Sequence, residues 1–172
     1  MRDLKPKNQK TSRERNIVLM IHNVRSLHNV GSMFRTADAA GVARIYLTGY
    51  TPRPTDRLGS YRAEIEKTAL GAERSVPWES VSSLSSVIAK LKKGGFFVCA
   101  LEQHSRSMPY HHFVARPHKK DIALIVGNEV RGLSSAALQR VDTVLELPMV
   151  GQKESLNVSV AAGIALFRLR YP

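Results

Sequence analysis

The C-terminal part of the chain combines a polar turn with a helix of small residues. Ser155 and Asn157 follow an apolar strand that ends at Leu147, and residues 161–165 read Ala-Ala-Gly-Ile-Ala. Hydroxyl and amide side chains at a helix start hold free backbone N–H groups, and that end carries partial positive charge. We therefore expect a helix opened by Ser155 and Asn157 whose first turn holds a small molecule. An ordinary capped core helix also explains Ser155, but it gives no special reason for Asn157.

A second candidate segment is Asn29-Val-Gly31-Ser-Met-Phe-Arg35. Gly31 and Arg35 are four residues apart, so on a helix they share a face, and Gly31 is expected to leave room above the guanidinium. A helix-entry glycine beside a surface arginine explains the same pattern equally well when the segment is judged alone.

The third candidate segment follows an apolar strand and reads Gly127-Asn-Glu129-Val-Arg131-Gly132-Leu133. A glycine directly after a buried strand lets a ligand approach the backbone, and Glu129 adds a negative charge at the rim. Judged in isolation, the better interpretation is a tight turn with a solvated glutamate.

Apolar runs alternate with helical repeats, and this pattern predicts one α/β domain with a mostly parallel sheet and helices on both faces. Ligands bind at the carboxyl ends of such strands, so we expect a composite pocket at the turns after Leu101, Val126 and Leu147. No glycine-rich dinucleotide fingerprint or phosphate-binding P-loop motif is present. The expected strands are 17–21, 44–48, 76–78, 96–101, 122–126 and 143–147, and the expected helices are 29–40, 81–93, 134–140 and 155–170.

The chain is strongly basic, with a formal net charge of +12 over 172 residues. Such an excess favours a polyanionic partner, and nucleic acid is preferred over a membrane because no apolar run is long enough to span one. The alternative is a basic protein whose lysines are solvated and that has no such partner. The single cysteine, Cys99, fits a reducing cytoplasm, and the histidines show no spacing typical of metal ligands.

Two segments outside the motifs are candidates for contact with a nucleic acid. Residues 1–15 are predicted to be a flexible basic arm, which would contact phosphate or serve only as a solubilising tail. Residues 50–70 are predicted to form a long loop leading into a short helix, and there Arg53, Arg57 and Arg62 are interleaved with tyrosines. That composition suits RNA, although a plain solvated loop is about equally compatible with it.

In their order and spacing, the three motifs closely resemble those of the SpoU (TrmH-like) branch of the SPOUT RNA methyltransferases. The matching residues are Asn29, Gly31 and Arg35, then Gly127 through Leu133, then Leu147-Pro-Met149 through Ser155-Leu-Asn157, and the resemblance spans residues 17–168. It implies a Rossmann-like sheet with a C-terminal trefoil knot, S-adenosylmethionine as the cofactor, and a homodimer whose site is completed across the interface. It also implies methyl transfer to a ribose 2′-hydroxyl of tRNA or rRNA.

The resemblance also implies roles for individual residues. Arg35 would be the catalytic arginine, supported by Asn29, and Glu129, Ser155 and Asn157 would complete the catalytic site. Because a guanidinium stays protonated in proteins, we expect Arg35 to hold a phosphate and stabilise developing negative charge rather than act as a base. The cofactor would lie against Leu101, Gly127, Leu147, Met149, Ser155 and Leu156. Together with the basic composition of residues 50–70, this gives Arg35, Arg53, Arg57, Arg62 and Arg131 as the expected RNA contacts.

Two questions about function stay open at the level of sequence. The first is whether the chain is an enzyme or a non-catalytic RNA-binding or ribosome-assembly factor on the same fold; the intact Arg35, Glu129 and Asn157 favour the enzyme. The second is the RNA itself, for which the short arm favours tRNA over rRNA. Methylation at another RNA atom is a further alternative within the enzyme class.

Overall fold

The computed structural model describes residues 15–113 and 121–171, which form one seven-stranded sheet flanked by helices. All strand pairs that define the sheet are parallel, in the order β3-β2-β1-β6-β4-β7-β5. The α/β class and the mostly parallel sheet expected from the sequence are confirmed. The elements are β1 (Ile17–His22), α1 (Leu27–Ala39), β2 (Arg44–Thr48), α2 (Ala63–Ala69), α3 (Ala72–Ser75), β3 (Trp78–Val81), α4 (Leu84–Lys93), β4 (Phe97–Leu101), β5 (Met108–Pro109), the 3₁₀ turn η1 (Tyr110–His112), β6 (Ile122–Val126), α5 (Ser135–Leu138), β7 (Thr143–Glu146) and α6 (Val158–Arg170).

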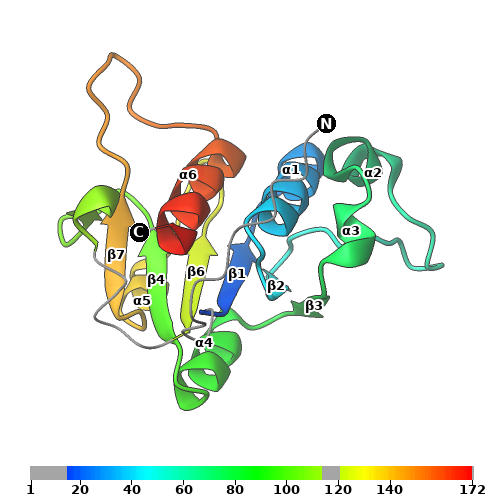
Figure 1. Cartoon of the computed structure of the whole chain (residues 1–172), viewed down its shortest axis with the longest axis horizontal. Helices are drawn as coiled ribbons and strands as arrows, with labels where there is room; N and C mark the ends of the chain where they lie inside the picture. The colour runs from blue at the N-terminus through cyan, green and yellow to red at the C-terminus, as the bar shows by residue number, and fades with distance from the viewer. Residues whose placement is uncertain (1–14, 114–120, 172) are drawn as a thin grey trace, which may run out of the picture.

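Both faces of the sheet are buried at its centre, which explains why the central strands β1, β4 and β6 are almost entirely apolar. In β1, Leu19 packs into a core shared with α1 and α6, whereas its neighbour Met20 packs into a second core shared with α4 and α5. Successive strand residues point to opposite faces, so a strand covered on both sides needs an apolar residue at every position. Figure 1 shows α1 and α6 together on one face of the sheet.

The central strands end at the same level, which brings the turns that follow them together. Leu101 at the end of β4 pairs with Val126 of β6 on one side and with Leu145 of β7 on the other. Val126 in turn pairs with Ile21 of β1. In Figure 1 the segment that joins β7 to α6 rises above this edge before the chain enters α6.

Several expected boundaries differ from the structure, and local capping explains most of the differences. Helix α4 begins at Leu84 because Ser83 accepts a hydrogen bond from the Ser86 N–H, and α5 begins at Ser135 because Ser134 caps it in the same way. The strand expected at 76–78 lies at Trp78–Val81, since α3 occupies the residues before it. The helix expected from 155 begins at Val158, with Asn157 as its cap.

Apart from Arg15, the basic arm lies outside the described residues, so its role stays a prediction. The trefoil knot also stays a prediction, with which the strand order is compatible. Within the described residues, no helix has both the length and the apolar character needed to cross a membrane.

Candidate active site

A cavity of about 500 Å³ opens at the carboxyl ends of β4, β6 and β7. Its wall combines the turn after β4, the segment after β6 and the segment from β7 to the first turn of α6. The six residues that the sequence assigned to a cofactor all line it: Leu101, Gly127, Leu147, Met149, Ser155 and Leu156. Glu129 and Asn157 line it too, so the expected composite pocket is present.

The loop 127–133 is a tight knuckle whose shape depends on its own hydrogen bonds. The Asn128 side-chain oxygen accepts from the backbone N–H groups of Val130 at 2.9 Å and Arg131 at 2.8 Å. A Cβ at Gly127 would stand 2.7 Å from the carbonyl carbon of Gly132. The missing side chain of Gly127 therefore accommodates the return of its own loop, rather than only the approach of a ligand as the sequence suggested.

Glu102 is a cavity residue that sequence reasoning missed. One of its carboxylate oxygens accepts the Leu133 N–H at 2.8 Å and the other accepts the Gln103 N–H at 3.1 Å. Gly132, with φ +61°, lies against this carboxylate, where a Cβ would stand 2.2 Å from the oxygen. Glu102 thus ties the end of β4 to the loop 127–133, and its place directly after an apolar strand was the available signal.

The three motifs meet in a polar cluster formed by Asn29, Glu129 and Asn157. The Asn29 side-chain amide donates to the Glu129 carboxylate at 3.2 Å, and the Asn157 amide donates to the Asn29 oxygen at 3.0 Å. Asn29 lies 100 positions from Glu129 and 128 from Asn157, so only the fold brings them together. The cluster expected from the motifs is therefore present for these three residues.

Glu129 is held as a carboxylate by a ring of donors. Its oxygens accept the backbone N–H groups of Ser26 at 3.3 Å and Arg25 at 3.4 Å, just before α1 begins. Partial burial by itself raises the pKa of this carboxyl. The hydrogen bonds from its own N–H, from Asn29 and from the Ser26 and Arg25 N–H groups outweigh that effect, so the pKa lies below its ordinary value. Glu129 is therefore negatively charged at neutral pH.

Asn157, rather than Ser155, opens the C-terminal helix. The Asn157 side-chain oxygen accepts the Ser159 N–H at 2.9 Å, and its φ and ψ of −54° and 136° are those of a cap. Ser155 lies two residues earlier in an exposed segment at the rim of the cavity. The expectation that both residues open the helix is wrong for Ser155, although both still face the same cavity.

Arg35 stands apart from the cavity, and the space expected around it is not created by Gly31. Arg35 lies exposed on α1 and is not among the residues that line the cavity. A Cβ on Gly31 would stand 2.0 Å from the Thr68 hydroxyl oxygen and 2.6 Å from the Ile65 carbonyl oxygen. Gly31 therefore lets α2 pack against α1, and the expectation that it leaves room above the guanidinium is wrong.

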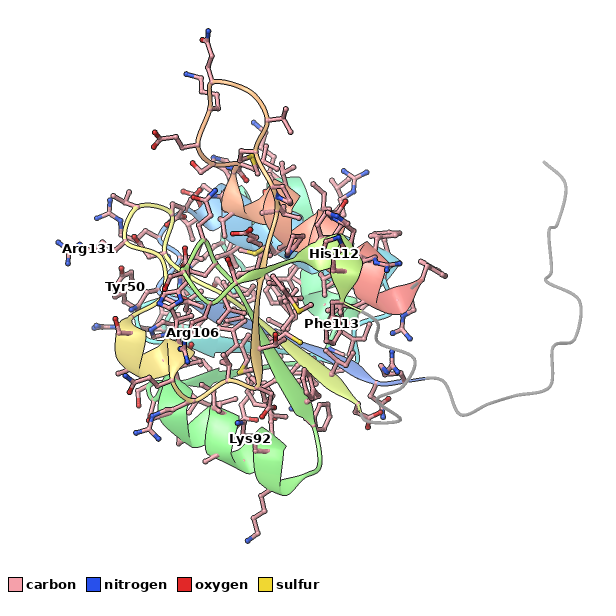
Figure 2. The ribbon with its side chains drawn as sticks, turned by 90° about the vertical axis from the view of Figure 1, so that its left-hand side faces the viewer. Tyr50, Lys92, Arg106, His112, Phe113 and Arg131 are labelled. Carbon is pink, nitrogen blue, oxygen red and sulfur yellow. The ribbon has the colours of Figure 1, made fainter. Side chains whose placement is uncertain are left out.

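The arginines assigned to RNA lie on several surfaces. Arg53 and Arg57 are exposed in the loop before α2, where the Arg53 side chain donates to the Ser80 hydroxyl at 3.1 Å. Arg62 precedes the first residue of α2 and is half-buried. Arg131 is exposed on the knuckle beside the cavity, on the same side of the molecule as Tyr50 (Figure 2). No cluster of His, Cys, Asp or Glu within residues 15–113 and 121–171 could hold a metal ion.

The chain belongs to the SpoU rRNA Methylase family, whose pattern matches residues 16–167. RlmB of Xanthomonas axonopodis pv. citri, a 23S rRNA (guanosine-2′-O-)-methyltransferase, is 31% identical over 153 residues, covering 89% of this chain and 57% of that protein. The AdoMet-bound rRNA methyltransferase of Sinorhizobium meliloti matches with a TM-score of 0.81 at 28% identity, over 91% of this chain and 56% of that one. The A. aeolicus TrmH/SpoU tRNA modifying enzyme matches with a TM-score of 0.77 at 28% identity, over 91% and 76%.

The chain thus spans a little over half the length of RlmB and of the S. meliloti protein. The family and the fold are shared along nearly all of this chain. The substrates of those longer proteins are therefore only proposed for this chain.

Proposed function

We propose that the chain is an S-adenosylmethionine-dependent RNA methyltransferase that acts on a ribose 2′-hydroxyl. The observation that carries the proposal is the hydrogen-bonded cluster of Asn29, Glu129 and Asn157, which joins all three motifs and of which Glu129 and Asn157 line the cavity. The names of the relatives support it, since one is a guanosine 2′-O-methyltransferase and another was solved with AdoMet bound.

The cavity fits this cofactor in size and in chemistry. A volume of about 500 Å³ is typical of small-molecule sites. Leu101, Leu147 and Leu156 offer apolar surface for a purine nucleoside, and Glu102 and Glu129 line the same space. Those negative charges complement the positive sulfonium and ammonium groups of S-adenosylmethionine. We assign the six cavity residues expected from the sequence to holding it.

The cofactor supplies, when bound, an electrophilic methyl group on a positively charged sulfur. The task of this chain is then to hold the ribose hydroxyl in line with that methyl group. The Asn29–Glu129–Asn157 cluster, fixed at the cavity by its own hydrogen bonds, is assigned to that orientation. Arg35 is assigned to the neighbouring phosphate and to the negative charge that develops on the 2′-oxygen.

A homodimer would bring Arg35 to the site. Arg35 lies exposed outside the cavity of its own chain, so we assign it to the site of a second copy. Helix α6 and Tyr171, the residue that follows it, expose an apolar stripe that a second copy would cover: Val160, Ile164, Phe167 and Tyr171, of which Val160 is 52% and Phe167 43% exposed. We therefore propose a homodimer that packs through this stripe.

We propose RNA as the class of substrate, without a preference between tRNA and rRNA. Relatives include proteins named for rRNA and for tRNA, so they give no support to the tRNA preference expected from the sequence. The exposed arginines 53, 57 and 131 are assigned to its phosphates. The cytoplasmic location expected from the sequence stays part of the proposal, and the unpaired, buried Cys99 is compatible with it.

Isothermal titration with S-adenosylmethionine tests the proposal at its first step. We expect saturable binding by the full chain, weakened about tenfold or more in Glu129→Gln because a carboxylate that faces the positive cofactor is lost. Arg44→Lys serves as the matched control, since Arg44 lies at the opposite end of the sheet on β2. The absence of binding, even with RNA present, would contradict the proposal and favour a non-catalytic RNA-binding factor.

A further inference from the structure

Asn128 has more hydrogen-bond partners than any other cavity residue that the described part of the chain contains, and none of the three motif roles uses it. Its side-chain NH₂ donates to the Asn23 carbonyl at 2.9 Å and to the Tyr50 hydroxyl at 3.1 Å. The same nitrogen lies 3.4 Å from a Glu129 carboxylate oxygen. Its oxygen meanwhile holds the knuckle through the Val130 and Arg131 N–H groups. One half-buried amide therefore joins the ends of β1, β2 and β6.

The acceptors of this amide are themselves rigid. Asn23 adopts φ 58°, a left-handed conformation that asparagine tolerates better than most residues. Its side-chain oxygen accepts the Tyr50 N–H at 3.2 Å, and its amide donates to the ring of His22 at 3.0 Å. Gly49, with φ +65°, passes so close that a Cβ would stand 1.9 Å from the Asn23 oxygen. Tyr50 is thus anchored at its backbone while its side chain is 56% exposed.

Tyr50 also begins the polar loop that carries Arg53 and Arg57, which the proposed function assigns to RNA phosphates. A hydrogen-bonded path from that loop to the proposed catalytic cluster runs through the Tyr50 hydroxyl, the Asn128 amide and the Glu129 carboxylate. Figure 2 places Tyr50 beside the knuckle that bears Arg131. Any shift of the loop would change the contact of the Tyr50 hydroxyl with Asn128, and with it the donor next to Glu129.

We propose that Asn128 is a positioning residue that couples the RNA-binding loop to the Glu129–Asn29–Asn157 cluster, with the Tyr50 hydroxyl as the contact between them. The inference rests on the proposed function. Neither residue is assigned to the transferring atoms: Tyr50 and Asn128 act through Glu129, whose orientation toward the cavity they set. RNA seated on the loop therefore acts on turnover and not only on affinity.

Two substitutions separate this role from simple folding. Asn128→Asp keeps the oxygen that holds the knuckle but replaces the donor with a negative oxygen beside Glu129 and the Asn23 carbonyl. Tyr50→Phe removes only an exposed hydroxyl. Asn16→Asp is the matched control, because Asn16 bonds the Asp121 carboxylate at 3.0 Å at the far end of β1, so it creates the same kind of repulsion away from the cavity.

The measurement is methyl transfer from labelled S-adenosylmethionine by the full chain to total RNA from cells that lack this protein. At saturating RNA we expect turnover to fall about thirtyfold in Asn128→Asp and about fivefold in Tyr50→Phe, while the half-saturating RNA concentration for Tyr50→Phe stays within twofold. We expect Tyr50→Phe to cause no further loss of turnover in the Asn128→Asp background, because both substitutions remove the same contact. Tyr50→Phe also shifts the NMR signals of the Asn128 side-chain NH₂, and Asn16→Asp lowers thermal stability without lowering turnover.

Two results would overturn the inference alone, and a third would overturn the proposed function together with it. Tyr50→Phe and Asn128→Asp with turnover at the wild-type level would show that the amide is only structural. Losses that multiply in the double variant would show that the two residues act independently. A wild-type chain that transfers no methyl group would remove the proposed function and this inference together, whereas an active wild type with unaffected variants removes the inference alone.

Discussion

At the scale of single residues, the site is defined by side chains that join segments far apart in the sequence. Glu129 accepts hydrogen bonds from the backbone that enters α1 and from Asn29, so one carboxylate ties the second motif to the first. Asn157 does the same for the third motif while it caps α6. The cluster is therefore prearranged, which lowers the cost of orienting a substrate group at the cavity.

Arg35→Lys tests the assignment of Arg35 to a phosphate and to the developing charge. Lysine keeps the charge but loses the planar fork that binds a phosphate through two parallel hydrogen bonds. We expect turnover to fall about tenfold or more in Arg35→Lys and about a hundredfold or more in Arg35→Ala, measured as methyl transfer at saturating cofactor and RNA. Arg44→Lys is the control, and turnover near the wild-type level in Arg35→Lys would contradict a two-bonded phosphate clamp.

Residue roles were predictable from the sequence where they depend on strand ends. Leu101, Gly127 and Leu147 line one cavity because β4, β6 and β7 are parallel and end at one level, which the apolar pattern indicates. Glu102 escaped notice because its partner, the Leu133 N–H, lies 31 positions away and no local pattern marks the pair. Asn128 escaped because its amide reaches Asn23, 105 positions away.

At the scale of elements, close packing of helices explains the small residues of the first motif. Helix α1 was predictable from its helical repeat, but the function of Gly31 was not, because only the contact with α2 shows what the glycine avoids. The start of α6 was ambiguous for a related reason. Ser155 and Asn157 are both good capping residues, and only the bond from Ser159 to Asn157 decides between them.

Gly31→Ala should destabilise the protein even though alanine is the better helix former by about 1 kcal/mol. Its methyl group would strike the Thr68 hydroxyl and the Ile65 carbonyl, so α1 and α2 must separate. We expect a net loss of about 2 kcal/mol, seen as a fall of about 4–8 °C in Tm. Gly151→Ala is the control, since a Cβ there meets nothing within 4 Å. An unchanged or higher Tm for Gly31→Ala would contradict this account of the helix packing.

At the scale of the whole molecule, one chain provides the cavity and the polar cluster but leaves Arg35 outside. The apolar stripe of α6 and the exposed position of Arg35 together support a dimer in which each copy completes the site of the other. The resemblance alone implied a homodimer, whereas the fold shows which face of α6 remains uncovered in the single chain.

Phe167→Glu tests the dimer, because a charge at the centre of the stripe cannot be buried without a partner. We expect the wild-type chain to sediment as a dimer at micromolar concentration and Phe167→Glu as a folded monomer with turnover reduced about a hundredfold. Ala89→Glu, at an exposed residue of α4 on the other face of the sheet, is the control for a new surface charge. A wild-type monomer at that concentration would contradict the dimer.

The central claim is methyl transfer to a ribose 2′-hydroxyl of RNA, and nucleoside mass spectrometry with site mapping tests it most directly. Total RNA from cells that lack this protein is incubated with S-adenosylmethionine and the wild-type chain, with Glu129→Gln and Asn157→Ala as matched variants. We predict a new 2′-O-methyl nucleoside at a defined position with the wild-type chain, and little or none with the variants. RNA that gains no methyl group, or gains one only on a base, would contradict the account.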